Sequence, residues 1–132
     1  MILKIGHIGI AVRNIEHVLD QLCRTLALDR PPVRTIAERK MKVAVVDLGL
    51  VGLELLEDSN KEGPLAGLVK RQGSFIHHLC LLTDDIDMEI AELTDRGVKM
   101  ADDKPYVGLR GKRIAFVASG ILDEIPIELS EP

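Results

Sequence analysis

The sequence has 132 residues, enough for one compact domain that buries roughly two-thirds of its unfolded surface. Hydrophobic residues make up 46% and charged residues 29% of the chain, an ordinary globular composition. The net charge of −4, with basic residues that form no stripe, argues against nucleic-acid binding, and no apolar run approaches membrane-spanning length. We therefore expect a cytoplasmic protein without nucleic-acid or membrane partners.

The first half of the chain predicts one helix among several strands. Its first apolar stretch alternates with small and polar residues at the period of a strand. Asn14 can then cap a helix whose apolar residues recur at helical spacing, and the pair Pro31 and Pro32 prevents its continuation. The expected elements are strands at 4–12, 32–36, 41–49 and 51–57, with a helix over 15–27.

Residues 58–74 are polar and predict a connection that contains one helical turn, at Leu65 to Lys70. The second half then repeats the plan of the first. Asp84 or Asp85 can cap a helix that Gly97 ends. The expected strands of this half are 75–83, 98–101, 112–118 and 125–130.

The two halves also repeat in sequence. The segment that begins at His7 aligns with the segment that begins at His78, at an offset of 71 residues. Further along, the offset between the halves increases by three residues, to 74, and at this offset Glu54 aligns with Glu128. Each half would have only marginal stability if it folded alone. We therefore expect one domain over 1–132, made of modules 1–57 and 75–132 with a connector at 58–74.

Each half therefore carries a histidine on its first strand and a glutamate on its last. Strand alternation places His7 and His78 on equivalent faces. A single histidine or glutamate of this kind is usually structural, but the recurrence at equivalent positions indicates a shared site. Two imidazoles and two carboxylates, from His7, Glu54, His78 and Glu128, would suit Zn²⁺, Co²⁺, Ni²⁺ or Mn²⁺.

Other polar residues have simpler interpretations. His77 projects to the opposite strand face and is predicted either to be structural or to support a metal ligand, and His17 lies on the polar side of the first helix, where we expect it to be exposed. Cys23 and Cys80 sit within apolar patterns without metal-type spacing, which predicts buried, reduced thiols. The acidic residues at 84–87 are better explained by helix capping than by calcium binding.

The sequence resembles the vicinal oxygen chelate superfamily, which includes glyoxalases, bleomycin resistance proteins and dioxygenases, and within it most closely the methylmalonyl-CoA epimerases. The double histidine followed by Asp-Asp-Ile is typical of the epimerase branch. The four stretches that carry the resemblance begin at His7, Leu53, Ile76 and Gly108, and the last of them leads to Ile127-Glu128-Leu129.

This resemblance implies an α+β fold in which two tandem βαβββ modules form a curved mixed sheet around a metal cleft, the glyoxalase-like fold. It implies metal ligands at His7, Glu54, His78 and Glu128, a divalent metal (Co, Ni, Mn or Zn), and a homodimer. The implied activity is epimerisation of an acyl-CoA thioester by α-proton abstraction, with Glu128 and Glu54 as catalytic residues. Glu38 is a second candidate base, because it keeps its place in a motif whose following glycine is here replaced by lysine.

Two other functions fit the same fold. A lactoylglutathione lyase of the glyoxalase I type would use the same ligands on a thiol adduct. A metal-free binding module would hold a small molecule between the modules, but such proteins generally lack the four-ligand set.

Overall fold

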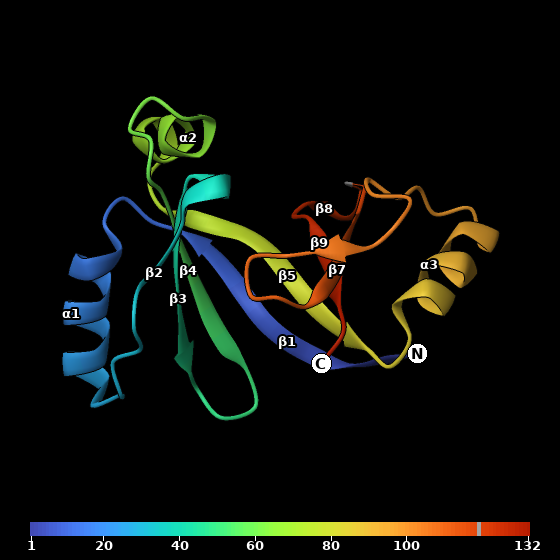
Figure 1. Cartoon of the computed structure of the whole chain (residues 1–132), viewed down its shortest axis with the longest axis horizontal. Coiled ribbons are helices and arrows are strands. Elements are labelled where there is room, and N and C mark those ends of the chain that lie inside the picture. Colours follow the sequence, from blue (N-terminus) through green and yellow to red (C-terminus); the bar gives the residue numbers. More distant parts are fainter. Residues whose placement is uncertain (119) are drawn as a thin grey trace. The chain divides into compact units, whose positions relative to one another are not determined.

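The computed structural model describes residues 1–118 and 120–132. Their contacts form two compact units, one of Met1–Ile8 with His78–Pro132 and the other of Gly9–His77. The long strands β1 and β5 each pass from one unit into the other. The elements are β1 (Ile2–Ala11), α1 (Ile15–Leu26), β2 (Arg34–Ile36), the short 3₁₀ helix η1 (Ala37–Arg39), β3 (Met41–Asp47), β4 (Gly52–Asp58), α2 (Pro64–Gln72), β5 (Phe75–Thr83), α3 (Ile86–Asp95), β6 (Tyr106–Val107), β7 (Arg113–Val117), β8 (Ile121–Glu124) and β9 (Ile127–Ser130), as Figure 1 shows.

The Gly9–His77 unit has α1 packed against a sheet with the strand order β2-β3-β4-β1. Both β2 and β4 pair with β3 in the antiparallel sense. Asn14 caps α1 as predicted, since its side chain accepts a hydrogen bond of 3.0 Å from the backbone N–H of His17. The apolar stripe of α1 then meets the sheet in a core of Val12, Ile15, Leu19, Cys23, Ala44, Val46 and Leu55.

The predicted connector contains a longer helix than one turn. Helix α2 spans Pro64–Gln72, with proline in its first turn, where its missing N–H costs no helical hydrogen bond. Asp58 supports this start, because its carboxylate accepts from the backbone N–H of Ala66 at 3.1 Å. Any side chain at Gly63 would collide with that carboxylate. The sequence pattern missed the length of α2 because its helical residues have a single buried member, Val69.

The other unit has the strand order β1-β5-β9-β7-β6. Strands β5 and β9 are parallel, whereas β9 and β6 pair with β7 in the antiparallel sense, so the sheet is mixed. Helix α3 packs against β7. The core of this unit consists of Ile86, Ile90, Ala115, Val117 and Leu129. The α+β class predicted from the sequence is confirmed.

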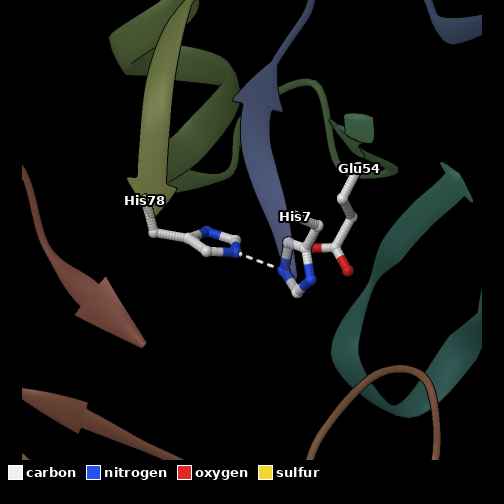
Figure 2. A group of neighbouring side chains, drawn as sticks. All are labelled: His7, Glu54 and His78. Carbon is white, nitrogen blue, oxygen red and sulfur yellow. Dashed lines mark hydrogen bonds between the residues drawn. The ribbon is translucent and has the colours of Figure 1, made fainter. Parts of the chain in front are cut away.

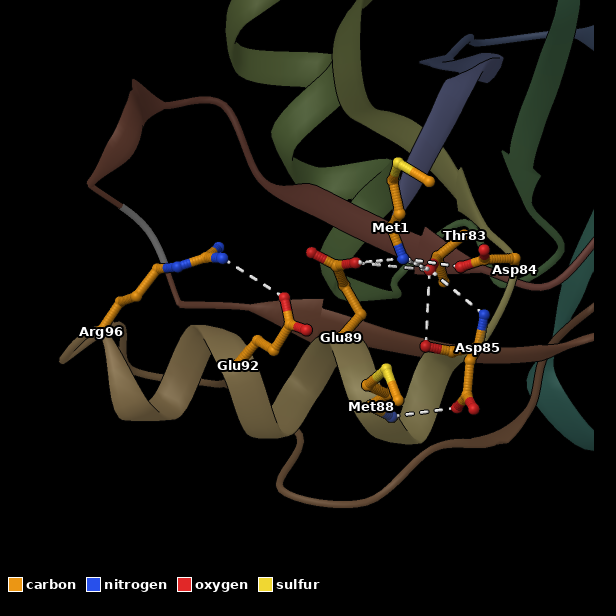
Figure 3. Close-up of polar contacts among 8 residues, drawn as sticks. All are labelled: Met1, Thr83, Asp84, Asp85, Met88, Glu89, Glu92 and Arg96. Atoms are coloured by element: carbon orange, nitrogen blue, oxygen red, sulfur yellow. Dashed lines mark hydrogen bonds and ion pairs between the residues drawn. The ribbon is translucent and has the colours of Figure 1, made fainter.

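Acidic residues organise the first turn of α3, as Figure 3 shows. Asp85 is the N-cap and accepts from the backbone N–H of Met88 at 3.0 Å. The buried carboxylate of Glu89 lies 2.9 Å from the amino group of Met1, which also lies 2.6 Å from Asp84. That ammonium group lowers the pKa of Asp84. The predicted capping role is therefore confirmed for Asp85, whereas the ion pairs of Asp84 and Glu89 with Met1 were not predicted.

The predicted strand at 98–101 is wrong. Met100 forms only an isolated bridge to Val117, and the strand that pairs with β7 on the side away from β9 is β6, further along the chain. The reason is local, because Ala101 and Asp102 both donate backbone N–H groups to the carbonyl of Phe116. The N–H of Phe116 donates a hydrogen bond of 2.8 Å to the carboxylate of Asp102. This side-chain bond replaces the backbone bond that a neighbouring strand would have made.

Strand β8 was not predicted, and it precedes β9 as a short exposed segment. Among the described residues, none of the helices combines the length and the apolar character that crossing a bilayer requires.

Candidate metal centre

Strand alternation brings the two histidines into the interior of one unit. His7 is on β1 and His78 on β5, and each is 2% exposed. Cys80 follows His78 on the same face of β5, and the parallel pairing of β5 with β9 places Cys80 opposite Glu128. Three of the four predicted ligands, His7, His78 and Glu128, therefore lie in the unit formed by Met1–Ile8 and His78–Pro132.

The two imidazoles face each other through their Nε2 atoms, which are 2.9 Å apart (Figure 2). Their rings meet edge to face, with centroids 5.1 Å apart. One carboxylate oxygen of Glu128 lies 3.4 Å from Nε2 of His7, and the other lies 3.7 Å from Nε2 of His78. The carboxylate thus reaches both imidazoles, and Glu128 itself is only 6% exposed.

Cys80 adds a sulfur atom to this cluster. Ligand atoms of His7, Cys80 and Glu128 lie within 4.8 Å of one another, and Cys80 is fully buried. Both cysteines are buried, reduced thiols, as predicted. The sequence did not single out Cys80 as a donor, although its spacing of two from His78 on a strand is a signal that could have done so.

A positive charge lies beside the cluster. Arg110, in the loop between β6 and β7, places a guanidinium nitrogen 2.7 Å from Nδ1 of His7. Burial and the charge of Arg110 lower the pKa of His7 to about 4. His7 is therefore neutral at pH 7, which is the form of histidine that binds metals. No role for Arg110 could be predicted from the sequence, because it lies 103 residues from His7 along the chain.

The fourth predicted ligand, Glu54, lies in the Gly9–His77 unit. It is on β4 opposite Val45 and is 4% exposed. Glu38, the other candidate base, is exposed on η1. His77 is half-buried with its ring near that of Phe75, and His17 is exposed, as predicted.

The donor set of the cluster fits a divalent metal. Imidazole, carboxylate and thiolate groups are the donors that Zn²⁺ and Co²⁺ bind in proteins, and here the two histidines, the glutamate and the cysteine that supply them are all buried.

Comparison with known proteins identifies the superfamily of the chain. Residues 6–116 match the family model of the Glyoxalase/Bleomycin resistance protein/Dioxygenase superfamily. The chain belongs to this superfamily. Its match to the model spans both histidines and Arg110.

Two relatives and one solved structure illustrate the likeness. The uncharacterised protein YqjC of Bacillus subtilis is 31% identical over 98% of this chain and 92% of its own length. The mitochondrial methylmalonyl-CoA epimerase of Dictyostelium discoideum is 28% identical over 97% of this chain and 78% of its own length. A variant of Streptomyces coelicolor methylmalonyl-CoA epimerase, in complex with 2-nitronate-propionyl-CoA, has a TM-score of 0.85 and 25% identity, with 99% of this chain and 95% of that chain covered.

Burial of His7 predicts a pH dependence of stability for this superfamily member. The pKa of His7 is about 4 in the folded protein and has its ordinary value of 6.5 when unfolded, so the unfolded chain binds a proton between these values and the folded chain does not. Stability of the metal-free protein should therefore fall as the pH falls from 6.5 towards 4, with His7 contributing up to about 3 kcal/mol.

Urea unfolding at pH 7, 5.5 and 4.5 measures this dependence. The burial of His77 lowers its pKa too, so the wild type is compared with His7→Gln to isolate the part due to His7. His17→Gln, at an exposed histidine, is the matched control and should keep the wild-type slope. An equal slope in His7→Gln and the wild type would contradict the assignment.

Proposed function

We propose that this protein is a metal-dependent epimerase that acts on an acyl-CoA thioester such as methylmalonyl-CoA, by removal and return of the proton on the α-carbon. The observation that carries the proposal is the buried contact of the Glu128 carboxylate with the Nε2 atoms of His7 and His78. Its support from other proteins is the 28% identity to a methylmalonyl-CoA epimerase and the likeness to an epimerase structure that contains an acyl-CoA ligand.

We propose that His7, Glu54, His78 and Glu128 together hold the metal. The chemistry that a bound divalent metal supplies is Lewis acidity towards a carbonyl oxygen, which lowers the cost of forming an enolate. The residues are suited to this task because both histidines are buried and His7 is neutral at pH 7. Glu54 would contribute a second buried carboxylate from the repeated position.

Epimerisation needs a base on one face of the α-carbon and a proton donor on the other. We propose that Glu128 takes the α-proton, and that Glu54, its equivalent in the repeat, serves the opposite face. Both carboxylates are buried, so the proton that completes epimerisation comes from the glutamate on the opposite face, which takes up a proton from solvent between turnovers. Glu38 is exposed, which makes it the weaker candidate.

The test is to incubate the protein with methylmalonyl-CoA in D₂O and to follow the α-proton signal by NMR. We expect exchange only when Co²⁺, Ni²⁺, Mn²⁺ or Zn²⁺ is present. The same preparations are assayed for turnover of the hemithioacetal of methylglyoxal and glutathione, which a lyase of the glyoxalase I type would consume.

The control compares His78→Asn, which removes a buried donor, with His17→Asn, which removes an exposed histidine. We expect only the first to abolish exchange and metal retention. Turnover of the hemithioacetal without α-proton exchange would instead indicate the lyase. Tight small-molecule binding with neither reaction and no bound metal would indicate a binding module.

A further inference from the structure

Arg110 is held in place by the loop that carries it. The N–H of Gly108 donates to the carbonyl of Lys112 at 2.9 Å, and the N–H of Gly111 donates to the carbonyl of Gly108 at 3.1 Å. Gly111 has a φ of +78°, which glycine adopts without strain. A side chain at Gly108 would come within 2.7 Å of Ile114. The loop therefore has a defined shape that keeps the half-buried Arg110 next to His7.

This contact determines which nitrogen of His7 carries the proton. A guanidinium has only donors, so Nδ1 of His7 must accept the hydrogen bond of 2.7 Å from Arg110. The proton of the neutral ring is then on Nε2. That proton points to Nε2 of His78, 2.9 Å away, which must accept it, so the proton of His78 is on Nδ1. A single chain of donors runs from Arg110 through His7 to His78.

The Nε2 atoms of the two histidines therefore differ in protonation, and only the one that carries no proton can bind a metal directly. His78 presents a lone pair on Nε2, whereas Nε2 of His7 is protonated. For Nε2 of His7 to become a ligand, its proton must move to Nδ1. There it would face the N–H of Arg110, and two donors cannot share a hydrogen bond. The guanidinium would also stand close to a second cation.

We propose that Arg110 and the metal compete for His7, and that Arg110, once displaced, binds the free carboxylate of the substrate. The inference rests on the proposed function, because it takes His7 as a ligand and a carboxylated acyl-CoA as the substrate. The planar fork of arginine suits bidentate binding of a carboxylate, and partial burial strengthens such a pair. Arg110 would thus select substrates that carry a second acid group.

The first readout is the position of the imidazole protons, from long-range ¹H–¹⁵N NMR spectra of the metal-free protein. We expect His7 to carry its proton on Nε2, and to carry it on Nδ1 after addition of Zn²⁺. A metal-free wild type with the His7 proton on Nδ1 would overturn the proposal.

The second readout is the affinity for Zn²⁺, measured by competition with a chromophoric chelator. Loss of a charge-assisted hydrogen bond that competes with the metal should make Arg110→Met bind Zn²⁺ on the order of 10-fold more tightly. Lys112→Met, in the same loop, removes an equal charge from an exposed side chain and should leave the affinity unchanged. Equal affinity in Arg110→Met and the wild type would overturn the competition.

The third readout is calorimetric binding of two acyl-CoA probes to the Zn²⁺-loaded protein. Arg110→Met should bind methylmalonyl-CoA on the order of 10-fold more weakly, but propionyl-CoA, which lacks the carboxylate, as tightly as the wild type does. Equal effects on the two probes would overturn the carboxylate role. A wild type that shows the first two readouts without catalysing α-proton exchange would refute the proposed function and leave the competition for His7 intact.

Discussion

Replacing Glu128 with glutamine should lower the rate of α-proton exchange on the order of 10²-fold or more, which is the usual cost of a missing general base. The glutamine oxygen can still bind a metal, but the amide is not basic. The neighbours that position this residue remain, since Glu128 pairs across β9 with Cys80 on one side and Phe116 on the other. Metal content measured on the same sample should stay close to that of the wild type.

Glu54→Gln is the internal control, because Glu54 holds the repeated position in the first half. We expect it to be the milder change, since glutamine often stands at the matching position in the epimerases that this chain resembles. If both variants exchange the α-proton at the wild-type rate with metal bound, the base lies elsewhere, and Glu38→Gln is the next variant to measure.

Replacing Leu19 with alanine should lower the free energy of unfolding by about 2–5 kcal/mol, the usual cost of truncating a fully buried leucine. Leu19 is 0% exposed and lies in the stripe of α1 that packs on the sheet. Removing its side chain leaves a cavity in the core that also contains Ile15, Val46 and Leu55, because the surrounding structure relaxes only partially.

The matched control is Leu26→Ala on the same helix. Leu26 is 56% exposed, so its truncation should change the free energy of unfolding by about 0.5 kcal/mol or less. Urea unfolding followed by circular dichroism measures both variants. Equal losses of stability in the two would contradict the packing of α1 described here.

Local patterns were enough to predict the elements that have a strong period or a clear cap. Strand alternation predicted β5 over residues 75–83, and Asn14 and Asp85 marked the starts of α1 and α3. Elements with weak periodicity were missed. Helix α2 has one buried residue, and at the end of the region predicted as a strand at 98–101 the backbone N–H groups of Ala101 and Asp102 both donate to the carbonyl of Phe116.

The kinds of ligand in the candidate centre could be predicted from the sequence, because the two halves align His7 with His78 and Glu54 with Glu128. The neighbours that those residues contact could not be predicted from the sequence. The positions of Arg110 beside His7, and of Cys80 beside His7 and Glu128, depend on which strands pair and on the shape of one loop. Hydrogen-bond direction and the lowered pKa of His7 follow from burial and from a charge 103 residues away along the chain, and only the tertiary structure brings such groups together.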